Sequence, residues 1–146
     1  MKQPQNKITH VTQYTPRACV YACLEMACFN AKSQQAIHRE MKEHNDDVSQ
    51  LGEFRQLVRL GIYPQLSPFT RLHAECVQLV TVPSLNLKGT NHRVLIDTRE
   101  VTTLYDPCKG LKGKKYYDAH LDDLKGFSEV TLLHYCNFKE GGPDAI

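Results

Sequence analysis

Residues 13–26 read QYTPRACVYACLEM, and this stretch has the features of a helix that begins near a cysteine. Thr15 suits the N-cap, and Pro16 suits the first helical position, where the N–H that proline lacks would be unpaired in any residue. Cys19 then falls in the first turn, where unpaired backbone N–H groups and the positive end of the helix dipole stabilise a thiolate. We therefore expect Cys19 to be a nucleophile.

Three helices are predicted in the first half of the chain, from the helical spacing of apolar residues and from end signals. Their expected ranges are 16–29, 33–44 and 50–60. Ser33 and Ser49 are the expected N-caps of the second and third helices, and Gly61 is the expected stop of the third.

The second half of the chain is rich in strand-forming residues. The strands are expected at 62–64 (a brief edge strand), 76–82, 92–96, 101–105 and 129–135, with a hairpin turn at 97–100, a short helix at 67–74 and a helical turn at 121–124. Helices followed by antiparallel strands predict an α+β fold. The 146 residues suffice for one domain, with a core over about residues 10–136 and a flexible tail at 139–146.

Composition narrows the classes of function. The net charge of +2 is too small to predict nucleic-acid binding. The sequence contains neither an apolar run of about 18 residues nor a signal-peptide core, so we expect no membrane span and a cytoplasmic location, although non-classical secretion would leave no mark. Reduced thiols follow from that location, and four of the six cysteines lie in apolar surroundings and are expected in the core: Cys23, Cys28, Cys76 and Cys136.

A cysteine nucleophile needs a base, and His92 is the histidine best placed to serve. It begins an apolar strand after a glycine-containing loop, whereas the other six histidines, His10 among them, occupy polar settings or lack a useful acidic neighbour. A hairpin centred near residues 98–99 would set position 92 opposite position 105 or 106, so that Asp106 can approach the imidazole and orient it. Taken singly, His92 could be a structural strand residue and Asp106 a turn residue before proline.

Gln13 lies six residues before Cys19, where its amide could donate to a developing oxyanion beside the Cys19 backbone N–H. A surface glutamine is the simpler interpretation of this residue alone. Cys19, Cys23 and Cys28 could instead form a thiolate metal site, but no matched pair of ligands follows them, so no metal or other cofactor is expected.

With these residues identified, the chain resembles the bacteriocin-processing double-glycine peptidases of the papain-like superfamily over about residues 10–135. The resemblance rests on Gln13-x5-Cys19, Ala22-Cys23-Leu24-x-Met26, Leu60-Gly61-Ile62, Val82-Pro83-Ser84-Leu85, Asn91-His92-Arg93-Val94-Leu95-Ile96, Val101-Thr102-Thr103-Leu104-Tyr105-Asp106-Pro107, and Phe127 with residues 129–135. It implies a papain-like α+β fold in which the cysteine helix packs on an antiparallel sheet. It also implies Cys19 as nucleophile, His92 as general base and acid, Asp106 as orienting carboxylate and Gln13 as oxyanion donor.

The expected function is a stand-alone cysteine hydrolase that cleaves an amide bond in a peptide or protein substrate. The same residues would serve a glutamine deamidase or an acyl transferase. The family usually has glycine after the cysteine, whereas this chain has Val20, which leaves open an inactive peptide-binding module of the same fold. The sequence predicts neither the substrate nor the oligomeric state.

Overall fold

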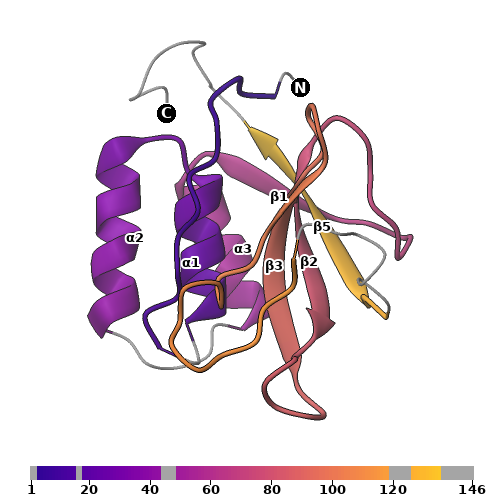
Figure 1. The fold of residues 1–146 in the computed structure, drawn as a ribbon. Coiled ribbons are helices and arrows are strands. Elements are labelled where there is room, and N and C mark those ends of the chain that lie inside the picture. The colour runs from indigo at the N-terminus through magenta and orange to yellow at the C-terminus, as the bar shows by residue number, and fades with distance from the viewer. Residues whose placement is uncertain (1–2, 16–17, 44–48, 119–125, 136–146) are drawn as a thin grey trace.

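The computed structural model describes residues 3–15, 18–43, 49–118 and 126–135, and within them three helices pack on a five-stranded antiparallel sheet (Figure 1). The elements are α1 (Cys19–Ala27), α2 (Ala31–Glu43), α3 (Gln50–Arg59), β1 (Ile62–Leu66), β2 (Val77–Pro83), β3 (Asn91–Asp97), β4 (Thr103–Tyr105) and β5 (Glu129–Tyr135). The strand order is β1-β5-β2-β3-β4. The predicted α+β class is confirmed, and none of the described helices is long and apolar enough to cross a membrane.

The sheet buries both of its faces, because alternate residues of each strand point to opposite sides. The helices cover one face (Figure 1), where Leu24, Leu57, Leu79, Leu95 and Leu133 are fully buried in one cluster. The opposite face carries a second cluster, whose buried members are Val80, Val82, Val94, Ile96, Leu104, Tyr117 and Val130. Strand β3 thus contributes side chains to two cores.

The first helix begins later than the sequence predicts. Its first residue is Cys19 and its N-cap is Ala18, which has no side-chain cap. The predicted N-cap Thr15 is wrong: its hydroxyl has no hydrogen-bond partner, and its backbone carbonyl accepts from the Ala18 N–H at 3.1 Å in a turn before the helix. Pro16 lies outside the described residues. The correction places the Cys19 backbone N–H among the unpaired donors of the first turn.

Of the other predicted helix ends, those of α3 are confirmed and the N-cap of α2 is wrong. Ser49 caps α3 as predicted, by accepting from the Gly52 N–H at 3.1 Å, and Gly61 follows with a positive φ of 78°. Asn30, rather than the predicted Ser33, caps α2, because its side-chain oxygen accepts from the Ser33 N–H at 3.0 Å. The helix expected at 67–74 does not form. Backbone groups of His73 bind the Gln78 side chain instead, and this holds the segment as a loop.

Some expectations fall on residues that the structure does not describe. They are the helical turn at 121–124, the tail at 139–146 and Cys136. Cys23, Cys28 and Cys76 are buried, as predicted.

A buried ion pair joins α3 to the middle of the sheet. Arg93 of β3 donates from Nε and Nη2 to the two carboxylate oxygens of Glu53, at 3.1 and 2.7 Å. The Arg93 guanidinium also donates to the hydroxyls of Thr81 and Thr131 at 2.7 and 3.0 Å. Both charged side chains are almost fully buried, so each depends on its partners for the hydrogen bonds that water would otherwise supply. The pair fixes β3 one residue after His92.

We expect Glu53→Ala to lower the free energy of unfolding by about 3–5 kcal/mol, because it leaves the Arg93 charge buried without its partner. Urea unfolding followed by circular dichroism measures the change. Leu51→Ala is the matched control on the same helix, since Leu51 is 60% exposed and its removal should change stability by less than about 0.5 kcal/mol. Equal effects of the two substitutions would contradict the role given to the pair.

Candidate active site

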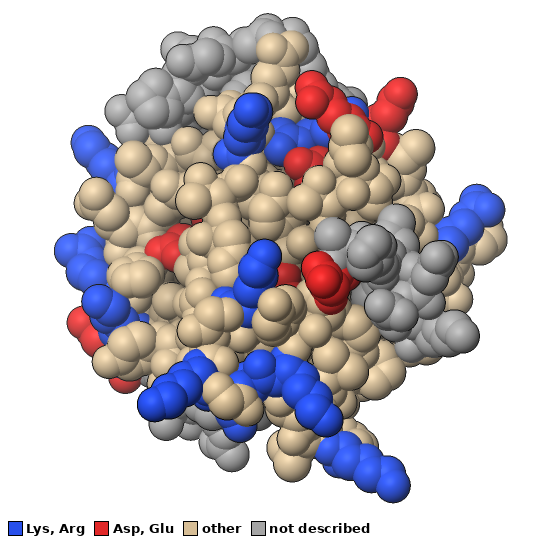
Figure 2. Space-filling view, viewed as in Figure 1, with Lys and Arg blue, Asp and Glu red and all other residues tan. Residues whose placement is uncertain are grey.

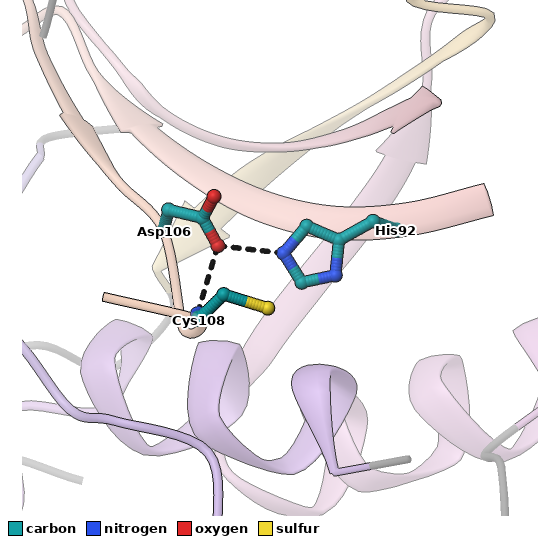
Figure 3. Close-up of side chains that lie close together, drawn as sticks. All are labelled: His92, Asp106 and Cys108. Atoms are coloured by element: carbon teal, nitrogen blue, oxygen red, sulfur yellow. Dashed lines mark hydrogen bonds and ion pairs between the residues drawn. The ribbon is translucent and has the colours of Figure 1, made fainter. Parts of the chain in front are cut away.

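His92 and Asp106 form a buried pair at the end of the β3–β4 hairpin (Figure 3). His92 Nε2 lies 2.6 Å from Asp106 Oδ1, and the two residues are 9% and 2% exposed. His92 is the second residue of β3, and Asp106 directly follows the last residue of β4. The sequence prediction that these residues meet is therefore confirmed.

The predicted register of the hairpin is wrong, although the contact between His92 and Asp106 that it predicted is present. Tyr105 pairs with Leu95 and Thr103 with Asp97, so the turn is centred near residue 100 rather than near 98–99. The two side chains still meet because they share a sheet face. His92 precedes Val94 of the second cluster by two residues, and Asp106 follows Leu104 of that cluster by two.

The Asp106 carboxylate accepts three hydrogen bonds. Besides His92, the Cys108 backbone N–H donates to Oδ1 at 2.8 Å, and the Tyr117 backbone N–H donates to Oδ2 at 2.7 Å. The Asp106 carbonyl accepts from Nε2 of His10 at 2.7 Å. An Asp106 side chain bound this way remains an acceptor, so the His92 Nε2 carries the proton in their contact.

His92 is held as an imidazolium. Burial alone would lower the pKa of His92, but hydrogen bonds to Asp106, Cys108 and Cys19, together with the negative charge of Asp106, raise it to about 12. Asp106 engages Nε2 of the ring, and the thiols of Cys108 and Cys19 lie near the same ring. The ring therefore lies close to both a carboxylate and sulfur.

Cys19 is the partly exposed thiol of this arrangement. It is the first residue of α1, and its thiol lies close enough to the His92 ring to contribute to the raised pKa of His92. The unpaired N–H groups of the first helical turn and the adjacent imidazolium both stabilise negative charge on sulfur. The structure thus brings together the nucleophile, base and carboxylate that the sequence predicts.

Gln13 is a buried residue, only 2% exposed, and not the surface glutamine of the simpler interpretation. Its backbone N–H donates to the Pro107 carbonyl at 2.8 Å, and its side-chain Nε2 donates to the Thr15 carbonyl at 2.8 Å. The amide nitrogen thus points toward the turn that leads into α1. An amide carries two N–H groups and the bond to Thr15 uses one, so the second can serve an oxyanion near Cys19.

Cys108 is a residue of the site that the sequence analysis missed. Its thiol is buried, donates to Gln13 Oε1 at 3.4 Å and lies within 4.8 Å of a His92 ring nitrogen. Figure 3 shows its side chain directed into the space beside that ring. Its place directly after Asp106-Pro107 was the available signal. His10, expected to be exposed, was missed because its partner lies 96 residues away.

The cysteines weighed as a metal site do not converge. The Cys23 thiol donates to the Arg93 carbonyl, and the Cys28 thiol to the Asn30 carbonyl. His92, Asp106 and Cys108 do offer ligand atoms within 4.8 Å of one another. However, the 2.6 Å between Nε2 and Oδ1 is a hydrogen-bond distance, whereas two such ligand atoms in a tetrahedral zinc site lie about 3.3 Å apart. The pair as arranged fits a shared proton better than a metal ion.

Asp106→Asn should destabilise the protein most at low pH. The folded pKa of His92 lies above its unfolded value of about 6.5, so the stability gained from protonation is complete below about pH 6.5 and declines as pH rises toward 12. The difference in unfolding free energy between wild type and variant should therefore shrink from pH 6 to pH 9, as measured by urea titration. A difference that grows with pH would contradict the imidazolium.

No family model matches this chain, and no curated protein matches its sequence.

Proposed function

We propose that the protein is a papain-like cysteine hydrolase that cleaves an amide bond in a peptide or protein, as in the double-glycine peptidases that its sequence resembles. One observation carries the proposal: a buried carboxylate–imidazole pair 2.6 Å apart that lies beside the Cys19 thiol at the N-terminus of a helix. A cysteine helix packed against an antiparallel sheet, followed along the chain by histidine and aspartate, supports the papain-like fold.

The reaction begins when the Cys19 thiolate attacks the scissile carbonyl carbon and forms a C–S bond. The carbonyl oxygen becomes an oxyanion, which the Cys19 backbone N–H and the Gln13 amide stabilise. The imidazolium of His92 gives its proton to the leaving amine as the C–N bond breaks. The neutral imidazole then takes a proton from water, whose oxygen attacks the thioester, and the thiolate departs as the acid product forms.

Val20 does not weigh against this chemistry. The family that the chain resembles usually has glycine here, and a side chain over the nucleophile would hinder a substrate. Val20 is half-buried and packs against the core cluster that contains Leu24. Its side chain is thereby engaged with the protein interior, which favours an active hydrolase over an inactive binding module.

Cys19→Ala should abolish cleavage of a quenched-fluorescent peptide library and leave the thermal unfolding midpoint nearly unchanged, because the thiol is partly exposed and bears the nucleophilic atom. Cys23→Ala is the control for a second thiol on the same helix, whose pKa burial raises well above its usual value. It should retain activity. Loss of activity in Cys23→Ala or Cys108→Ala, with Cys19→Ala active, would assign the nucleophile elsewhere.

The activated thiolate can also be tested without a substrate. Iodoacetamide should alkylate Cys19 at pH 6 at least about tenfold faster in the wild type than in His92→Ala, since the imidazolium stabilises the thiolate. Peptide mass spectrometry identifies the modified cysteine and its rate. Equal rates in the two proteins would remove the main support for a thiolate–imidazolium pair.

A further inference from the structure

Two loops beside the active site carry positive charge without any acidic residue. They are residues 84–90, between β2 and β3, and residues 107–117, after Asp106, and together we call them the lysine lip. Its lysines are all exposed: Lys88, Lys109, Lys112, Lys114 and Lys115. Figure 2 shows Lys and Arg side chains gathered over the lower part of the molecule, where these loops lie in Figure 1.

The two loops are joined into one unit. Asn86 Nδ2 donates to the Lys115 carbonyl, and the Lys115 N–H donates to Asn86 Oδ1, both at 2.8 Å. The Tyr117 hydroxyl donates to the carbonyl of Pro83 at 2.6 Å. The two bonds between Asn86 and Lys115 and the bond between Tyr117 and Pro83 restrict the movement of one loop relative to the other.

The lip is also anchored to the catalytic groups. The Asp106 carboxylate accepts from the backbone N–H groups of Cys108 and Tyr117, near the two ends of the second loop. Thr12 Oγ1 donates to the Lys109 carbonyl at 2.7 Å. Gly110 has a φ of +91°, and a Cβ atom at this position would come within 2.8 Å of Thr12 Oγ1. The Asn86 amide lies 3.9 Å from the Cys108 sulfur. These bonds hold the backbone of the lysine lip next to the groups that surround His92.

We propose that the lysine lip selects peptides that are acidic near the scissile bond, an inference that rests on the proposed peptidase function. The lysine lip combines charged and apolar side chains, and this combination favours a peptide over a nucleic acid as its ligand. Leu85, Leu87 and Tyr116 are 42%, 63% and 43% exposed among the lysines, and they offer apolar contacts to the side chains of a peptide. Fixed positive charge beside the site attracts carboxylates over a range limited by salt screening.

The test compares three peptides of one sequence with Glu, Gln or Lys on either side of the cleaved bond, once a cleaved sequence is found. The Glu peptide should exceed the Lys peptide about tenfold in kcat/KM at about 50 mM NaCl and lose most of that advantage at about 500 mM. Lys112→Glu/Lys114→Glu should reverse the preference. The control variant Lys7→Glu/Lys32→Glu, which changes the net charge equally at exposed residues outside the lip, should keep it.

Several outcomes would overturn the proposal. Equal kcat/KM for the three peptides would refute it and leave the peptidase function standing. If the wild type cleaves no peptide, the lip is tested by fluorescence anisotropy with the Cys19→Ala protein and labelled Glu and Lys peptides. Preferential binding of the Glu peptide, lost in Lys112→Glu/Lys114→Glu, would support the lip alone. A labelled single-stranded oligonucleotide of equal charge that binds more tightly would assign the surface to nucleic acid.

Discussion

The buried carboxylate of Asp106 is the group on which the candidate site depends. A carboxylate that is 2% exposed must obtain from the protein the hydrogen bonds that water would supply, or its burial is strongly unfavourable. Here its donors come from His92, Cys108 and Tyr117. One carboxylate therefore fixes the imidazole and both ends of the following loop. Asparagine is a poor substitute, because its NH₂ group would face a backbone N–H where the carboxylate presents an acceptor.

Residues on the two faces of β3 hold the site through different contacts. His92 points to the face with the Asp106 carboxylate, while the next residue, Arg93, points to the helices and binds Glu53 of α3. The Arg93 carbonyl accepts from the Cys23 thiol of α1 at 3.4 Å. The strand that carries the base is thereby tied to two helices, one of which carries Cys19. This arrangement limits the relative motion of Cys19 and His92 more than either contact would alone.

Local sequence patterns predicted many of the helices and strands. The features they did not predict depend on contacts between residues far apart in the sequence. Alternating apolar residues located β5 at 129–135, and Ser49 with Gly61 located α3. The apolar pattern of α3 does not indicate which residues are buried, since Leu51 and Val58 are exposed whereas Glu53 is buried. Glu53 is buried because it pairs with Arg93 of β3. The contacts of Cys108 and His10 could not be predicted locally, because their partners Gln13 and Asp106 lie 95 and 96 residues away along the chain.

The thiols of Cys108 and Cys19 both lie near the His92 ring, but their surroundings differ. Cys108 is 6% exposed, and its thiol donates to the side-chain oxygen Oε1 of Gln13, so it orients the Gln13 amide. Cys19 is partly exposed at the first turn of α1, where unpaired N–H groups stabilise negative charge. By turning Gln13 Oε1 toward itself, Cys108 leaves Nε2 pointing to the start of α1. The buried Cys108 thiol positions the Gln13 amide, and Cys19 is the more exposed of the two sulfurs.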